Sequence, residues 1–215
     1  MTHSDNVSAR RSTIEDWTEA LAQSTGSPGG GAASGVMLAL AYSLTSMVAG
    51  YTKAEGERAA ELRELQARAA EGRETALALA DADAAASESF GSAFRIDRGP
   101  RREEAIREAS VEAAEASAAL GRQGADAVGD LEWLVEHGNP ALIADVAVAV
   151  GALRAAIAGA RANVSFDLSS LTSGGESLGE VKERHPVLWQ TVHGLDAVLA
   201  RIDRLSRSIE LPLAE

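Results

Sequence analysis

Residues 26–52 carry no charged side chain, and this stretch constrains the fold more than any other part of the chain. It opens with Pro28-Gly29-Gly30-Gly31 and ends with Tyr51-Thr52. A segment of this length would cross a bilayer, but its many Ala, Gly and Ser residues contribute little to insertion compared with Leu, Ile and Phe. We therefore expect a helix over about 32–50 that is buried among other helices rather than in lipid.

The glycine run suggests a binding surface. Without Cβ atoms, Gly29, Gly30 and Gly31 allow a ligand to approach the backbone closely. A helix that begins here would direct its free N–H groups and the positive end of its dipole toward a carboxylate or a carbonyl. These three glycines are therefore candidate substrate-binding residues.

Composition favours an all-α fold. The chain is 46% hydrophobic, with many alanines, and only 4% aromatic, and prolines and β-branched residues are sparse. We predict a disordered tail at 1–11 and a single helical domain at 12–215, a bundle with two buried central helices at about 32–50 and 141–160. The first predicted helix ends at about 23. The others cover about 32–50, 54–94, 101–136, 141–171, 177–184 and 187–209, and Gly72 and Gly91 are candidate breaks in the helix at 54–94.

Charge and residue types exclude several classes of function. The net charge of −12 disfavours binding to nucleic acid and to anionic lipid. The absence of cysteine excludes disulfides and thiolate chemistry. The four histidines show no metal-ligand spacing, so we expect no metal. The N-terminus is polar and lacks the pattern of a signal peptide, and we expect a cytoplasmic protein.

Four polar residues stand out in the Ala-rich segments. Asp145 is the one carboxylate in an apolar helix, and it must find a partner, raise its pKa or face a polar cavity. Asp81 and Asp83 are two positions apart and point in opposite directions on a helix, so that one faces inward as a candidate acid or base. Asn163 offers a donor and an acceptor for a heterocycle. The alternatives are structural: a buried cap, a solvated helix face and a backbone hydrogen bond.

Together these segments resemble the folate cyclodeaminase/cyclohydrolase family, which includes the C-terminal half of formiminotransferase-cyclodeaminase. Four motifs occur in the family's order. They are Pro28-Gly29-Gly30-Gly31 with Met47–Thr52, Leu79-Ala80-Asp81-Ala82-Asp83, Gly138-Asn139-Pro140 with Asp145, and Ala160-Arg161-Ala162-Asn163-Val164. The resemblance covers about residues 12–208.

The resemblance implies an all-helical homodimer that binds a tetrahydrofolate derivative without a metal or redox cofactor. It implies that Asp83 is the catalytic residue, with Asp81 as the alternative. It also implies that the glycines, Asp145 and Asn163 line the folate pocket. The expected reactions are deaminating cyclisation of 5-formiminotetrahydrofolate to 5,10-methenyltetrahydrofolate and hydrolysis of the latter to 10-formyltetrahydrofolate.

The chain departs from the family pattern in four places, one of which is the aromatic residue that usually follows the third-helix Asp closely, where Ala86 and Ser87 stand here. Ala32 and Ala144 stand where the family often has Ser, and Asp167 stands near the position of a second Asn. Lost hydroxyl groups weaken polar contacts to a ligand. Two alternatives therefore stay open: a folate-binding or structural homodimer without catalysis, and a helical bundle unrelated to folate.

Overall fold

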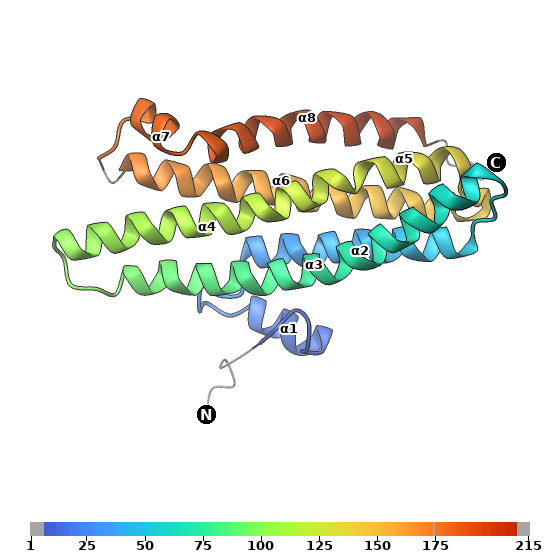
Figure 1. The fold of residues 1–215 in the computed structure, drawn as a ribbon. Coiled ribbons are helices and arrows are strands. Elements are labelled where there is room, and N and C mark those ends of the chain that lie inside the picture. Colours follow the sequence, from blue (N-terminus) through green and yellow to red (C-terminus); the bar gives the residue numbers. More distant parts are fainter. Residues whose placement is uncertain (1–6, 174, 210–215) are drawn as a thin grey trace.

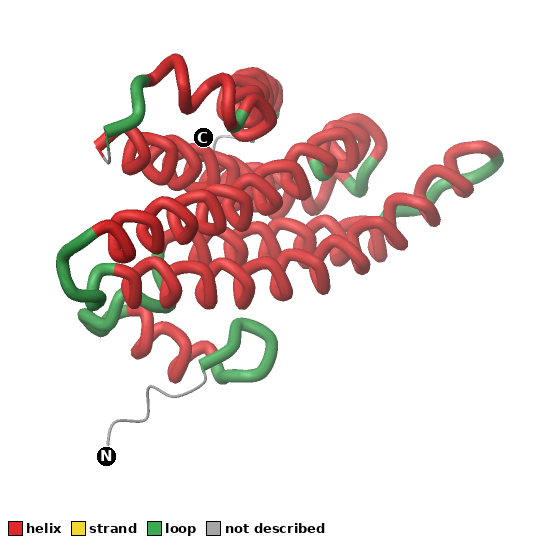
Figure 2. The backbone as a smooth tube through the Cα atoms, turned by 60° about the vertical axis from the view of Figure 1, so that its left-hand side comes forward, coloured by secondary structure: helices red, strands yellow, loops and turns green. Residues whose placement is uncertain are grey.

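The computed structural model describes residues 7–173 and 175–209, and this part of the chain contains helices and connections but no strand (Figures 1 and 2). The elements are α1 (Ile14–Leu21), α2 (Gly30–Tyr51), α3 (Glu57–Ala93), α4 (Pro100–Asp126), α5 (Val128–His137), the 3₁₀ turn η1 (Pro140–Leu142), α6 (Ile143–Ser173), α7 (Leu178–Arg184) and α8 (Pro186–Ser208). The predicted all-α bundle is confirmed.

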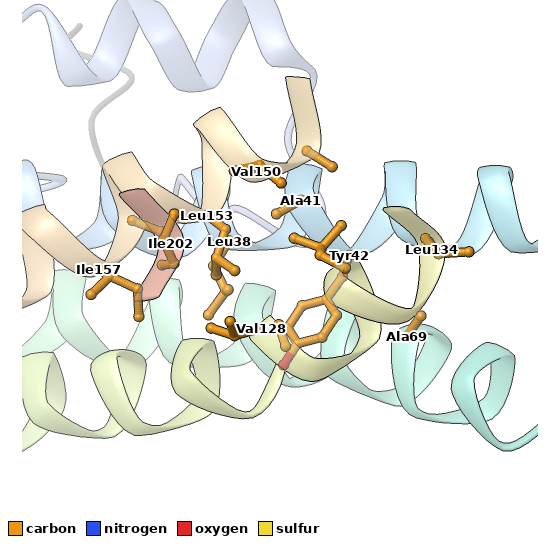
Figure 3. Close-up of a cluster of buried hydrophobic side chains, with 14 of the residues drawn as sticks. Leu38, Ala41, Tyr42, Ala69, Val128, Leu134, Val150, Leu153, Ile157 and Ile202 are labelled. Carbon is orange, nitrogen blue, oxygen red and sulfur yellow. The ribbon is translucent and has the colours of Figure 1, made fainter. Parts of the chain in front are cut away.

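Helices α2 and α6 lie at the centre of the bundle. Both contact α4, while α3 packs on α2 and α8 packs on α6. Between them lies a core of aliphatic side chains that water does not reach (Figure 3). Its largest members include Leu38, Val128, Leu153, Ile157 and Ile202. Burial of such side chains is the main stabilising term for a fold of this kind.

Close helix contact depends on small residues in the bundle. A Cβ atom at Gly35 of α2 would lie 2.7 Å from the Cβ of Ala80 on α3. A Cβ atom at Gly72 would lie 2.5 Å from ring carbons of Tyr42, whose hydroxyl donates to the carbonyl of Gln123 at 2.7 Å. The predicted break at Gly72 is therefore wrong: α3 continues through it, because this glycine makes room for a ring.

Other predicted boundaries also need correction. The helix predicted over 101–136 is two helices, α4 and α5, with Ala127 between them. Helix α2 begins at Gly30, two residues earlier than predicted, so that two of the three glycines lie in its first turn. Gly91 lies within α3 and does not end it.

The two central helices are only partly buried. Leu40 is 53% exposed and Tyr51 is 66% exposed on α2, and Val148 is 61% exposed on α6. Both α2 and the η1–α6 segment are long and apolar enough to cross a membrane, and within the bundle each buries one face and leaves another uncovered. The two predicted central helices are thus buried on one face and exposed on another.

Candidate functional site

Asp83 lies where α3 meets the N-terminus of α2. Its side chain is only 4% exposed. The hydroxyl of Ser117 on α4 donates to its Oδ1 at 3.0 Å, and the backbone N–H of Ala32 also donates to the carboxyl group. A Cβ atom at Gly31 would overlap this carboxyl group. Position 31 therefore requires glycine because the carboxyl group lies against the helix backbone.

Opposing effects act on the pKa of Asp83. Burial raises this pKa above its ordinary value, and the hydrogen bonds from Ser117 and Ala32 lower it by a smaller amount. The partial positive charge at the start of α2 also favours the ionised form. A carboxyl group with a raised pKa and a fixed orientation is suited to carrying a proton during a reaction.

Helix α6 contributes two side chains to the same region. The amide of Asn163 lies beside Gly30, where a Cβ atom would be 3.9 Å from its Oδ1. Asp167 follows one turn later on the same face and is 8% exposed. Burial, and then the charge of Asp83, raises the pKa of Asp167 to about 7. Two buried carboxyl groups, from α3 and α6, thus lie near the start of α2.

The glycine segment is held against α3 at this point. The hydroxyl of Ser27 donates to the carbonyl of Ala84 at 2.7 Å, one residue after Asp83. Gly29 caps α2 without a side-chain hydrogen bond, and Gly30 and Gly31 form its first turn. Of the predicted binding glycines, the structure therefore places Gly30 beside Asn163 and Gly31 beside Asp83, whereas Gly29 lies next to its own loop.

Asp81, the alternative catalytic residue, lies outside this site. Its carboxylate accepts a hydrogen bond from the hydroxyl of Ser8 at 2.7 Å and another from the backbone N–H of Ala9 at 2.6 Å. The disordered tail predicted for 1–11 is therefore corrected from Ser8 onward, since this segment is bound to α3, while residues 1–6 lie outside the described part. Asp81 fixes the N-terminal segment, and Asp83 faces the site.

Asp145 is not brought to the site within one chain. It is half-buried in the first turn of α6, whereas Asn163 lies 18 residues later. At 1.5 Å per residue this separation is about 27 Å along the helix axis. The role of Asp145 in a folate pocket stays a prediction.

The remaining polar features lie elsewhere. In the described part of the chain, no group of three His, Asp or Glu residues could hold a metal ion. One polar cleft of about 390 Å³ lies between α3 and α4 and is lined by Arg68, Gln123 and Asp130, among others. A more apolar cleft of about 270 Å³ lies between α6, α7 and α8, beside Trp189. Neither contains a predicted site residue.

Sequence reasoning missed two members of the site. Ser117 is one of many small residues on an Ala-rich helix, and its spacing gives no signal. The sequence identified Asp167 as a departure from the family motif, but did not predict it as a site residue. Its spacing of four from Asn163 was the available signal, because this spacing places both on one face of a helix.

Comparison with known proteins identifies a family and a fold for this chain. The family model described as formiminotransferase-cyclodeaminase matches residues 13–178. No curated protein sequence matches the chain. The crystal structure of formiminotetrahydrofolate cyclodeaminase from Thermotoga maritima is similar with a TM-score of 0.76 and 24% sequence identity, over 93% of this chain and 98% of that one. At this identity, the likeness is evidence for the fold.

Proposed function

Since the chain belongs to the formiminotransferase-cyclodeaminase family, we propose that it catalyses the deaminating cyclisation of 5-formiminotetrahydrofolate. The observation that carries the proposal is the buried carboxyl group of Asp83, held against the N-terminus of α2 by hydrogen bonds from Ser117 and Ala32. The name of the similar Thermotoga maritima structure supports the same reaction.

The reaction needs one group to move a proton. N10 of the substrate attacks the formimino carbon, and a tetrahedral carbon forms between N5 and N10. N10 then loses its proton, the amino group on the carbon gains one, and ammonia leaves as the C–N bond breaks. In our proposal Asp83 accepts the proton from N10 and delivers it to the leaving nitrogen, and its raised pKa suits both steps. The amide of Asn163, beside Gly30, would orient the folate ring.

Turnover of Asp83→Asn tests the proposal. We expect purified protein to convert 5-formiminotetrahydrofolate to 5,10-methenyltetrahydrofolate, followed by the growth of the near-ultraviolet band of the product. Loss of the acid–base group should lower the rate by about 10²–10⁴. Asp81→Asn is the matched control, because this carboxylate lies two residues away on the same helix but binds Ser8 and Ala9 instead.

Each outcome has a definite meaning. Full turnover by Asp83→Asn would refute the role of this residue. Decay of added 5,10-methenyltetrahydrofolate faster than in buffer would instead assign the hydrolysis to 10-formyltetrahydrofolate. Folate binding without any turnover would support the non-catalytic alternative.

We further propose that the protein is a homodimer joined through the exposed faces of α2 and α6. The supporting observation is that Leu40, Tyr51 and Val148 are more than half exposed on two adjacent helices. Helix α2 carries no charged side chain, and on α6 Asp145 lies one turn before Val148. Apolar patches of this kind mark interaction sites. Light scattering should show a dimer for the wild-type protein and a monomer for Leu40→Lys. A wild-type monomer that binds lipid vesicles would favour a membrane-facing role for the same surface.

A further inference from the structure

Asp83 and Asp167 lack a basic partner in the described part of the chain. Neither forms an ion pair with a Lys, Arg or His side chain there. The two arginines of α6, Arg154 and Arg161, instead contact Asp203 and Asp196 on α8. The pair therefore lies in a buried region whose negative charge is not balanced by a neighbouring side chain.

The two carboxyl groups differ in their hydrogen bonds. Asp83 accepts from Ser117 and from the backbone of Ala32, at the positive end of the α2 dipole. Asp167 is 8% exposed, and no described residue donates a hydrogen bond to it; its oxygens are not among the fully enclosed polar atoms without a partner, so their remaining contact is with solvent. A buried carboxylate without a partner is costly, so such a group keeps its proton or obtains a partner from a ligand. Asp83 is thus the member better suited to carry the charge, and Asp167 is the member that holds the proton.

The charged groups around Asp167 do not include a described side chain that could balance its negative charge. Asp83 of α3 is the charged group that acts on it. Around Asp83, helix α2 presents the backbone N–H of Ala32 and α4 presents the uncharged Ser117, and both donate to Asp83. The arginines of α6 point toward α8. A positive charge that balances Asp167 would therefore have to come from a bound molecule.

We propose that Asp83 and Asp167 together select the one-carbon unit in its cationic form, a carbon between two nitrogens that share one positive charge, and that Asp167 releases its proton when this cation binds. The inference rests on the proposed function and deepens it. Both the protonated formimino group and the methenyl bridge carry such a charge, whereas a formyl group on the same nitrogen is neutral. No covalent step is involved: the proton of Asp167 passes to solvent, and the bound cation takes its place.

Proton release on binding provides the direct test. Calorimetric titration in buffers of different ionisation enthalpy counts the protons released when 5,10-methenyltetrahydrofolate binds. Because the pKa of Asp167 is about 7, we expect close to one proton at pH 6 and almost none at pH 8.5. Neutral 5-formyltetrahydrofolate is the control, since its pterin ring and its tail are the same although it lacks the closed five-membered ring, and it should release none.

Asp167→Asn separates charge selection from simple packing. The amide has nearly the shape of the carboxyl group but cannot ionise. At pH 8 we expect this variant to bind the cationic folate at least about tenfold more weakly, since a nearby opposite charge is worth one or more pKa units. Its affinity for 5-formyltetrahydrofolate should be unchanged.

Two results would overturn the inference while leaving the proposed function intact. One is binding of both folates with no difference in proton release. The other is an Asp167→Asn variant that keeps the preference for the cation. Failure of the wild-type protein to bind either folate would be a different result, because it would overturn the proposed function as well.

Discussion

The substitution Asp167→Asn should stabilise the protein by an amount that grows with pH. The pKa of this group is about 7 in the folded protein against 3.8 ordinarily, a difference of about three units. At about pH 3 and below, the group is largely protonated in both the folded and unfolded states and affects stability little. As pH rises toward 7, the unfolded chain loses the proton first, and the free energy of unfolding of the wild-type protein falls. At about 1.36 kcal/mol per unit, the loss reaches about 4 kcal/mol above pH 7.

Urea unfolding from pH 4 to pH 8.5 measures this difference. The Asn variant lacks the titrating group, so its advantage over the wild type should rise from about 0.6 kcal/mol at pH 4 to about 4 kcal/mol at pH 8. Glu112→Gln, which removes one charge from the exposed surface of α4, controls for the change in net charge. An advantage that stays constant across this range would refute the reasoning, because it would show that Asp167 does not gain a proton on folding.

Three further predictions concern the surroundings of the site. Gly31→Ala should abolish turnover, because the added methyl group overlaps the carboxyl group of Asp83. Gly50→Ala is its control on the same helix: the added methyl group meets no other atom, and the variant should be more stable in thermal unfolding by up to about 1 kcal/mol. Asp81→Ala should speed tryptic cleavage of the N-terminal segment roughly 5- to 30-fold, since two hydrogen bonds worth about 1–2 kcal/mol hold it; an unchanged digestion rate would show that other contacts suffice. Ser117→Ala should move the acid limb of the pH–rate profile to higher pH, because the hydrogen bond that is lost favours the ionised form of Asp83 and lowers its pKa; a movement to lower pH would contradict this assignment.

The helical architecture could be predicted because its signals are local. The uncharged stretch at 26–52 and the breaks at Asp97–Pro100 and His137–Pro140 separate helices that the structure confirms. The small residues within helices were harder to interpret. Gly72 was a candidate break, but a glycine that makes room for the Tyr42 ring has the same sequence signature as one that ends a helix.

The site was predictable where one helix or one motif defines it. The spacing of Asp81 and Asp83 predicted that they point to opposite sides of the helix. In the structure Asp81 binds the N-terminal segment, and Asp83 is buried and accepts from Ser117. Contacts between helices were not accessible in this way. Nothing local identifies Ser117 as the donor to Asp83, because the two are 34 residues apart. The distance of Asp145 from Asn163 follows from one helix containing both, which the sequence did predict.

The antiparallel pairing of α2 and α6 has a consequence for the length of these helices. Gly30 lies beside Asn163 and Ser34 beside Gly159, so that four residues along one helix are matched by four along the other. One residue inserted into α6 just before this point would turn Asn163 and Asp167 by about 100° and remove both from the site. The same turn would displace the buried Val164 and Leu168, which follow on the same helix. Functional relatives of this protein should therefore vary in length at their loops and keep a fixed number of residues between the core and the site.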